Sequence, residues 1–321
     1  MRLVTDFSIC ISPGKHLHAR IAQAQELCSD VVIQSALVSM YGRFGELEVA
    51  EHLFSDNPLP DTALWNGMLT TCFQNGLDRD CLVLYNHMQQ LCAMQNKITY
   101  IVMLSVCSKI ASLVEGKKLH TCIVTLGCEA DIMVGTALIN MYSKCGHVDN
   151  ANDIFGRTLG RDLVMWNAMI AGYAQSGKSG HVFHFFEKML EQGIKPDVVS
   201  FLAVMCACSR NGLFHRGKTY FEAMTEDYGM VPTIRHHSCM IDLLGRTGEV
   251  DKAVEMVKKM PFCPNLVVWH TILSASKYWG TTSIGKQAFQ QAIHLDKNDA
   301  VAYTMITHIL ANIEIKGNQT N

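Results

Sequence analysis

The chain repeats itself with a step of about 100 residues, and this repetition constrains the fold more than any other feature. The segment ALVSMYGRFGELEVAEHLF, which begins at Ala36, returns without a gap at Ala137 as ALINMYSKCGHVDNANDIF, and a looser third copy begins at Cys239. A fixed period marks a repeat array, in which each unit stacks on its neighbours because it cannot bury its apolar face alone. The sequence therefore predicts a solenoid.

Two further series keep the same step and show what one unit contains. They read LWNGMLTTCFQNG, MWNAMIAGYAQSG and VWHTILSASKYWG from Leu64, Met165 and Val268, and GKHLH, GKKLH and GKTYF from Gly14, Gly116 and Gly217. In residues 163–197 an apolar pattern with helical spacing ends at a glycine, and a second apolar run follows and ends before a proline that cannot continue a helix. Each unit is therefore predicted to be a pair of helices, and the chain all-α.

Counting from turn to turn divides the chain into units of 31 to 36 residues. These units cover 31–61, 62–96, 97–131, 132–162, 163–197, 198–233 and 234–265, and a related unit covers 266–299. Residues 1–30 read as the second half of a unit, and the tail, 300–321, begins a further helix over 300–313 and then becomes polar. Because a solenoid needs polar caps at both ends, we expect the chain to be a fragment or truncated product of something longer.

Composition excludes several classes of protein. A hydrophobic share of 49% and a charged share of 17% are enough for a continuous core and exclude a disordered chain. No run of eighteen apolar residues occurs, so we expect no membrane association. The net charge of −2 argues against binding of RNA or DNA that is dominated by contacts to the phosphates, although it leaves recognition of bases open.

Thirteen cysteines raise the question of metal or disulfides, and their spacing answers it. No CxxC pair exists, and the nearest two, Cys206 and Cys208, are expected on different sides of a helix. Most others lie in apolar helical patterns, among them Cys72, Cys107, Cys122 and Cys239. We expect buried thiols that act as small hydrophobic side chains, in a reducing compartment.

Signatures of catalysis are missing from the sequence. A zinc deaminase needs an HxE…CxxC signature, and neither part occurs. A Walker loop, a nucleophile elbow and a Rossmann glycine run are also absent. We interpret His181 with His184, and His236 with His237, as packing or solvent-facing residues. The sequence predicts no enzyme, no metal site and no cofactor.

The repeated residues identify a known family. Paired helices of about 35 residues, MY(S/G)(K/R)xG turns, GKxLH segments and WNxMIxGYxxxG helix starts resemble plant pentatricopeptide repeat (PPR) proteins, whose fold is a right-handed superhelical solenoid. The alternation of units of 31, 35 and 35 residues is similar to the PLS subfamily. Residues 267–300 resemble the first E-type extension motif. Tetratricopeptide repeats are the nearest alternative, but their WxxLGxxY pattern is absent.

The resemblance implies that the chain binds single-stranded RNA with one base per repeat, each base read by two or three side chains. In the family the reader is the fifth residue of the first helix, assisted by the last residue of the unit. The corresponding pairs here are Ser35 with Asp61, Asn66 with Asn96, Thr136 with Asp162, Asn167 with Asp197, and Ser238 with Asn265. The long units give Ile101 with Asp131 and Leu202 with Thr233, which depart from a readable pair, and His270 occupies the position in the extension.

The family rule assigns guanine to a hydroxyl with Asp, adenine to a hydroxyl with Asn, and uracil to Asn with Asp. The target expected from 5′ to 3′ is G, pyrimidine, any, G, U, any, A. Apolar second residues such as Val32 and Val164 are expected to sandwich the bases. The alternative explanation is that Asn, Ser and Thr occur here because they favour the first turns and caps of helices.

The resemblance further implies a specificity factor for C-to-U editing of an organellar transcript. The extension would recruit a deaminase-bearing or editing-complex protein, since a deaminase domain is missing here. Alternatives are RNA processing or stabilisation without editing, a scaffold that binds peptides in the groove, and an idle truncated paralogue. We expect a monomer in a mitochondrion or chloroplast, although residues 1–14 make a poor transit peptide.

Overall fold

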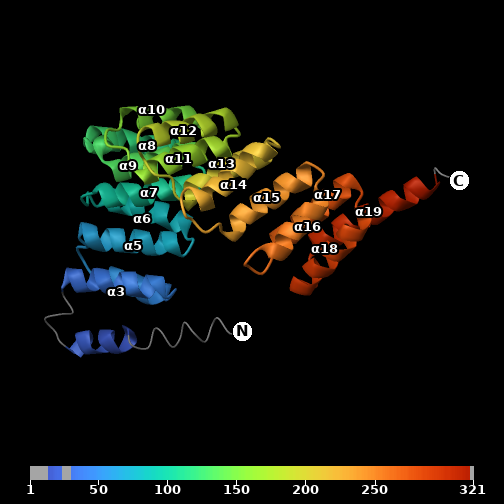
Figure 1. Ribbon diagram of the computed structural model, residues 1–321. Helices are drawn as coiled ribbons and strands as arrows, with labels where there is room; N and C mark the ends of the chain where they lie inside the picture. Colours follow the sequence, from blue (N-terminus) through green and yellow to red (C-terminus); the bar gives the residue numbers. More distant parts are fainter. Residues whose placement is uncertain (1–13, 24–29, 319–321) are drawn as a thin grey trace. The chain divides into compact units, whose positions relative to one another are not determined.

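The computed structural model describes residues 14–23 and 30–318, and all secondary structure within them is helical (Figure 1). This confirms the prediction of an all-α fold. The segments 1–13, 24–29 and 319–321 lie outside the described residues. They include most of residues 1–14, assessed above as a transit peptide, and parts of the predicted half-unit 1–30 and of the tail 300–321. In the part that is described, no helix is both long and apolar enough to cross a membrane.

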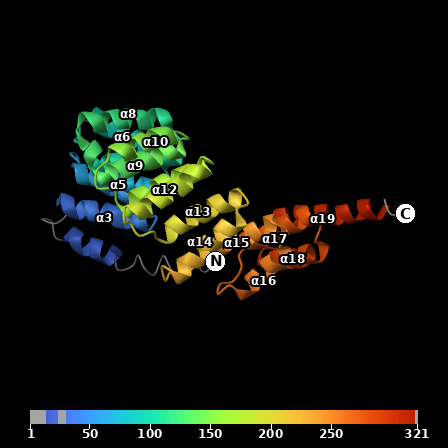
Figure 2. The ribbon, with the colours of Figure 1, turned by 45° about the horizontal axis from the view of Figure 1, so that its top comes forward.

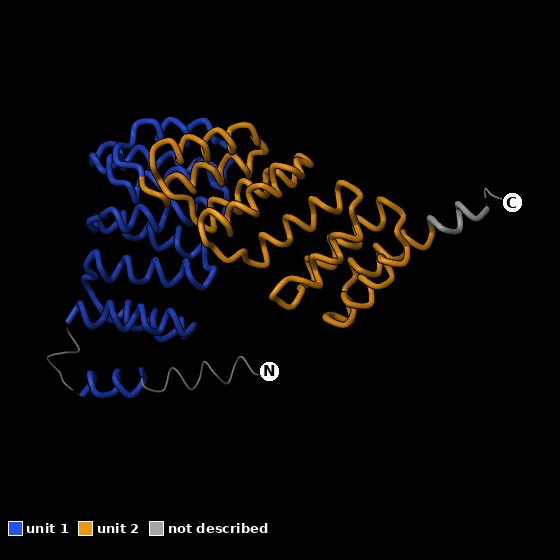
Figure 3. The backbone as a smooth tube through the Cα atoms, viewed as in Figure 1, with its two compact units in different colours: residues 1–161 blue, residues 162–321 orange. Residues whose placement is uncertain are grey.

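The chain divides into two compact units, residues 1–161 and 162–321, which are coloured separately in Figure 3. The first unit contains a helix over residues 14–23 and then four helical hairpins. The hairpins pair α3 (Val31–Arg43) with α4 (Leu47–Ser55), α5 (Thr62–Gln74) with α6 (Asp78–Gln90), α7 (Lys97–Lys109) with α8 (Leu113–Thr125), and α9 (Ile132–Lys144) with α10 (Val148–Arg157). A short 3₁₀ helix, η1 (Cys128–Ala130), precedes α9.

The second unit contains four further hairpins and a last helix, α19 (Ala300–Asn318). The hairpins pair α11 (Leu163–Gln175) with α12 (Ser179–Glu191), α13 (Val198–Arg210) with α14 (Phe214–Glu226), α15 (Ile234–Arg246) with α16 (Val250–Lys259), and α17 (Leu266–Trp279) with α18 (Thr282–Leu295). Helix α19 continues five residues beyond the predicted end at Ile313, because no proline interrupts its polar end.

Within each unit the helices form two layers. The first helices of successive hairpins pack side by side, α3 on α5, α5 on α7 and α7 on α9 in one unit, and α11 through α19 by odd numbers in the other. Each second helix packs against its own first helix and against the first helix of the next hairpin, as Figure 2 shows for α16, α17 and α18. This arrangement leaves one face of the first helices uncovered by second helices.

The last residue of each sequence unit is the N-cap of the next first helix. Asp61 accepts a hydrogen bond from the N–H of Leu64, and Asp162 accepts one from the N–H of Met165. These caps satisfy helix N–H groups that have no partner within the helix. The cap positions are occupied by Asp30, Asp61, Asn96, Asp131, Asp162, Asp197, Thr233 and Asn265.

The turns between paired helices depend on glycine. Gly45, Gly146 and Gly248 have φ angles of +76°, +82° and +86°, a left-handed conformation that other L-residues adopt at a cost. These glycines belong to the repeated MYGRFG, MYSKCG and LLGRTG segments. The conformation therefore explains their recurrence without a functional role.

The GKxLH series joins each second helix to the next first helix. A Cβ atom on Gly116 in α8 would lie 2.8 Å from Cε of Met141 on α9, and one on Gly217 in α14 would collide with Cδ1 of Leu243 on α15. The histidine that ends the series bonds to the tyrosine of the next MY pair: His120 Nδ1 lies 2.9 Å from the hydroxyl of Tyr142, and the same contact recurs in residues 14–43. These contacts fix the stacking of consecutive hairpins.

The cysteines only partly follow the expectation of burial. Cys72 and Cys107 are buried, but Cys122 and Cys239 are half-buried, and for these two the expectation was wrong. Cys239 is the sixth residue of α15, at the edge of the face that second helices leave uncovered. Helical apolar spacing marks a stripe, and residues at the edge of the stripe remain partly exposed.

Candidate nucleic-acid interface

The uncovered face of the first helices carries the predicted reading residues. In a helix, residues three or four positions apart share a face, so the second, fifth, ninth and thirteenth residues align. The second residue of most first helices is apolar and exposed, so it does not contribute to the core. These residues are Val32, Ile98, Met133, Val164, Val199 and Val267. Val32 is 76% exposed and Val164 is 61% exposed.

In the first unit, the predicted pair Asn66 and Asn96 is hydrogen-bonded. The side-chain Nδ2 of Asn66 donates to Oδ1 of Asn96 over 3.0 Å, and Oδ1 of Asn66 accepts from the hydroxyl of Thr99 over 2.7 Å. Asn96 is also the cap of α7, where Thr99 completes a capping box. The reading residue of one repeat and the cap of the next therefore form one network.

The second unit repeats this network with Asn167 and Asp197. Nδ2 of Asn167 donates to Oδ1 of Asp197 over 3.0 Å, and Oδ1 of Asn167 accepts from the hydroxyl of Ser200 over 2.5 Å. Burial disfavours a charged Asp197, but the N–H of Ser200 and the amide of Asn167 donate to it, and the net effect lowers its pKa. A carboxylate is therefore held beside the amide.

The amide of each reading asparagine is engaged but not saturated. An amide has two N–H donors and two acceptor lone pairs, and each network described above uses one of each. Asn66 is only 6% exposed, so a base would contact one edge of its amide. The sequence did not predict this mutual support between reader and cap.

The predicted hydroxyl readers behave differently. Thr136 and Ser238 each donate to the backbone carbonyl four residues earlier, of Ile132 and Ile234, over 2.8 Å. The buried hydroxyl oxygen of Ser35 has no protein partner within the described residues. Back-bonding directs the hydroxyl hydrogen to the helix and leaves the oxygen as an acceptor.

The assisting residues of these hydroxyl pairs act as caps. Asp61, Asp162 and Asn265 accept from backbone N–H groups of α5, α11 and α17. Within the described residues, Asp61 makes no hydrogen bond to Ser35, and Asn265 makes none to Ser238. Thr136 belongs to the first unit and Asp162 to the second. Among the predicted reader pairs in the described residues, the structure thus joins reader and cap directly where the reader is asparagine.

The pairs of the long units lack a polar reader. Ile101 and Leu202 are partly exposed, and their assisting residues are occupied elsewhere. Asp131 caps α9 and forms an ion pair with Lys97 at 3.2 Å, and the lysine is the main cause of the lowered pKa of the carboxyl. The hydroxyl of Thr233 lies 2.7 Å from Nδ1 of His236 in the cap of α15.

The extension-like unit also joins its fifth residue to the next cap. Nε2 of His270 lies 2.5 Å from Oδ2 of Asp299, while Oδ1 of Asp299 accepts from the N–H groups of Val301 and Ala302. Burial opposes the charge on Asp299, but the contact with His270 and these N–H groups prevail and lower its pKa. His270, whose role the sequence left open, thus occupies the same structural position as Asn66 and Asn167.

Sequence reasoning missed a row of basic residues at the thirteenth position of the first helices. Arg43, Lys109 and Lys144 end first helices in the first unit, and Arg210 and Arg246 do so in the second. The signal was present, because three of them are the basic residue of the repeated turns MYGRFG, MYSKCG and LLGRTG. A chain of net charge −2 therefore still places basic side chains on this face, of which Lys109 is paired with Asp78 and Arg246 with Asp242.

Grooves on this face bring reading and basic residues together. Between α7 and α9 a groove of about 590 Å³ is lined by Ile101, Met133, Thr136, Lys109 and Lys144, among other residues. Apolar, polar and cationic groups in one groove suit a ligand with a flat apolar ring, a polar edge and negative charge. No group of histidines, cysteines and carboxylates that could hold a metal ion occurs among the described residues.

The arrangement defines a repeat protein of helical hairpins with polar side chains on an uncovered face, and comparison with known proteins gives its family. Residues 161–210 match the PPR repeat family, and 63–92, 136–163, 199–228 and 236–263 each match the PPR repeat. A putative pentatricopeptide repeat-containing protein of Arabidopsis thaliana is 34% identical over 94% of this chain and 40% of its own length. The chain belongs to the PPR repeat family.

Two further relatives from Arabidopsis thaliana carry organelle names. The pentatricopeptide repeat-containing protein CRR2, chloroplastic, is 32% identical over 94% of this chain and 46% of its own length. A relative named as mitochondrial is 30% identical over 93% of this chain and 35% of its own length. The chain thus spans less than half the length of these relatives.

Solved structures show the same fold. Maize PPR10 superposes with a TM-score of 0.68 at 16% identity, over 89% of this chain and 42% of that one. PPR10 in complex with an 18-nt psaJ RNA element gives a TM-score of 0.71 at 16% identity, over 92% of this chain and 48% of that one. This similarity confirms the predicted PPR solenoid fold.

Proposed function

We propose that the chain binds single-stranded RNA on the uncovered face of its first helices, with one base per repeat. The observation that carries this proposal is the network that recurs at Asn66 with Asn96 and at Asn167 with Asp197. The two amides are held in the same way and lie one step of the sequence repeat apart, so two repeats would present the same group to a base. Caps alone explain Asn96 and Asp197, but they do not explain why an amide recurs at the fifth residue.

Binding would combine three kinds of contact. Exposed apolar second residues would stack on the bases, which aromatic side chains stabilise by about 1–3 kcal/mol per base and aliphatic ones by less. The fifth and cap residues would bond to the base edges, and basic thirteenth residues would approach the phosphates. The crystal structure of PPR10 in complex with an RNA element supports this by analogy.

The base preferences follow the proposed pairs. Ser35 with Asp61 and Thr136 with Asp162 would select G, Asn66 with Asn96 a pyrimidine, Asn167 with Asp197 U, and Ser238 with Asn265 A. The target from 5′ to 3′ is then G, pyrimidine, any, G, U, any, A. Asp197 suits an acceptor role, since the N–H groups and the amide that donate to its carboxylate favour the charged form.

We further propose that the repeats span 31–265 in the units given above and that 266–299 is an E-type extension of a PLS-subfamily protein. In that case the chain would specify the site of C-to-U editing and bring a deaminase-bearing protein to it. The chloroplastic and mitochondrial names of CRR2 and the other relative favour an organelle. This segment would act by binding and not by catalysis.

The test is a gel shift with two RNA oligonucleotides, one with the proposed target and one in which purines and pyrimidines are exchanged. Preferential binding of the first supports the proposal, and equal binding refutes the base code. The ratio of absorbance at 260 and 280 nm after low-salt purification provides an independent check. A protein free of nucleic acid that binds neither oligonucleotide would favour the peptide scaffold instead.

A further inference from the structure

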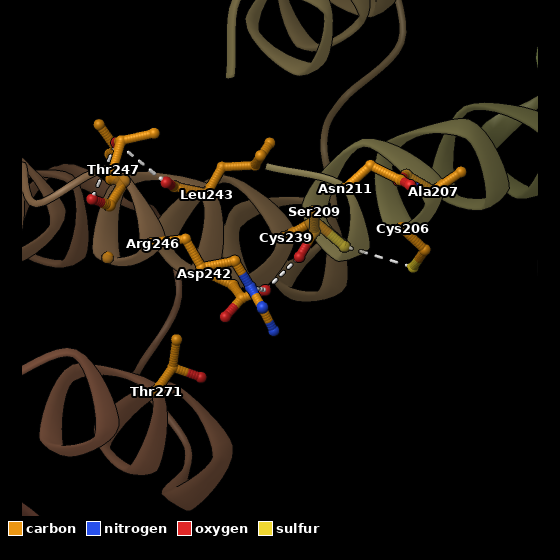
Figure 4. Close-up of polar contacts among 12 residues, drawn as sticks. Cys206, Ala207, Ser209, Asn211, Cys239, Asp242, Leu243, Arg246, Thr247 and Thr271 are labelled. Carbon is orange, nitrogen blue, oxygen red and sulfur yellow. Dashed lines mark hydrogen bonds and ion pairs between the residues drawn. The ribbon is translucent and has the colours of Figure 1, made fainter. Parts of the chain in front are cut away.

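Two thiols face each other across successive first helices of the second unit. Sγ of Cys206, the ninth residue of α13, lies 3.4 Å from Sγ of Cys239, the sixth residue of α15 (Figure 4). Both residues are half-buried, and Cys206 shares the uncovered face with the second, fifth and thirteenth residues of its helix. No group of three metal-ligating residues includes them within the described chain. Packing between α13 and α15 alone does not require two sulfurs in contact.

We propose that Cys206 and Cys239 form a peroxide-sensitive dithiol that closes to a disulfide between α13 and α15. Closure needs the sulfurs to approach from 3.4 Å to about 2.05 Å, a shift within reach of side-chain rotation and small helix movement. The site stands on this geometry and does not depend on RNA binding.

The surroundings favour one of the two sulfurs as the nucleophile. A hydrogen bond from Cys239, aided by the positive charges of Arg210 and Arg235, lowers the pKa of Cys206 to about 7, against the opposing effects of burial and of Asp242. The same hydrogen bond and burial raise the pKa of Cys239. Of the two thiols, Cys206 therefore ionises first as the pH rises, and Cys239 keeps its proton.

The reaction balances with hydrogen peroxide as the oxidant. The Cys206 thiolate attacks one peroxide oxygen, the O–O bond breaks, and the products are a sulfenic acid and hydroxide, which takes the proton of Cys239 to become water. The Cys239 thiolate then attacks Sγ of Cys206, the S–O bond breaks, and hydroxide leaves and is protonated by solvent. Two thiols and one peroxide give one disulfide and two waters.

Other cysteines of the chain provide internal comparisons. Cys208 lies two residues from Cys206 but is buried, and burial raises its pKa to about 11. Cys72 and Cys81 form a second interacting pair, but both are buried in the first unit. Accessibility and a low pKa thus coincide with a close partner at Cys206.

The test oxidises the full reduced chain with about one equivalent of hydrogen peroxide, blocks free thiols with N-ethylmaleimide and digests with trypsin without reductant. Trypsin releases Cys206 in residues 189–210 and Cys239 in residues 236–246. Mass spectrometry should find these two peptides joined, and dithiothreitol should separate them. Absence of the joined peptide, at a peroxide dose that oxidises the exposed Cys92 or Cys263, would overturn the proposal.

Matched variants identify the sulfurs. Cys206→Ser and Cys239→Ser should each abolish the joined peptide, and Cys208→Ala should retain it. A joined peptide that survives in Cys206→Ser would overturn the assignment, because Cys208 would then be the partner. Circular dichroism verifies the fold of each variant. In the wild-type chain the alkylation rate of Cys206 should exceed that of Cys208 at least tenfold at pH 7, and equal rates would contradict the proposal.

Discussion

The side-chain amide of Asn167 donates to the carboxylate of Asp197 over 3.0 Å, so the fifth residue of one repeat is held by the cap of the next helix. Asn66 and Asn96 repeat this geometry in the other unit. Under the proposed function the relationship couples folding to recognition, because the side chain that caps the next helix also orients the amide proposed to read a base. A substitution at the cap should therefore affect both stability and base preference.

Replacing the reading amide should change the preferred base. Asn167→Ser with Asp197 retained should shift the preference at the fifth base of the target from U to G. An exchange of one hydrogen bond, worth about 0.5–1.5 kcal/mol, corresponds to about 2- to 10-fold in affinity. Fluorescence anisotropy with the four base variants measures the shift. Asn86→Ser, an exposed change on the second helix α6, is the control and should leave the preference unchanged.

Acid should destabilise the chain in part through Asp197. Its pKa is lowered in the folded state, so its contribution to stability is complete above its ordinary value of 3.8 and is lost as the pH falls through the folded value. Asp197→Asn keeps a good cap but cannot titrate, so the stability difference between wild type and variant should shrink as the pH falls from 6 to 2.5. Urea denaturation followed by circular dichroism measures it. The exposed Asp251→Asn is the control, and an equal trend there would contradict the assignment.

Two glycine substitutions in the first unit should have opposite effects on stability. A Cβ atom on Gly42 would lie 2.8 Å from Cβ of Thr71 on α5, so Gly42→Ala should destabilise by about 1–3 kcal/mol through overpacking. A Cβ on Gly156 in α10 meets no atom within 4 Å, so Gly156→Ala should stabilise by about 0.5–1 kcal/mol. Thermal unfolding compares the midpoints. Equal shifts for both variants would show that α3 and α5 pack less closely than the structure indicates.

Removing a basic thirteenth residue should weaken RNA binding irrespective of sequence. Lys144→Ala removes a charge from the groove that also contains Thr136. For single strands, each lost phosphate contact reduces the magnitude of the slope of log K against log salt concentration by about 0.7. Affinities for target and exchanged RNA at several salt concentrations measure it. Lys118→Ala on α8, in an exposed ion pair with Glu115, should leave the slope unchanged.

The sequence predicted the fold class because the repeated residues are required by the local structure of each repeat. Glycine at 45, 146 and 248 marks a turn that only glycine adopts freely, and Trp65 and Trp166 mark a buried position in register. These are local signals, and their recurrence at a fixed step makes them unambiguous. The residues of the reading face were also found by register, but their use as readers stays a prediction.

What the sequence did not predict depends on contacts between helices. The bond between Asn167 and Asp197 joins residues 30 apart, and the contact between Cys206 and Cys239 joins residues 33 apart. Both require the rotation of one first helix against the next, which apolar spacing does not specify. The basic residues were missed for another reason: a net charge of −2 averages over both layers and hides a local row.

Selection from a randomised RNA pool followed by sequencing tests the central claim most directly, because it assumes no target. The account predicts enrichment of G, pyrimidine, any, G, U, any, A in this order, with U replaced by G for Asn167→Ser. Enrichment of an unrelated motif, or of none above the unselected pool, would contradict base reading by these residues.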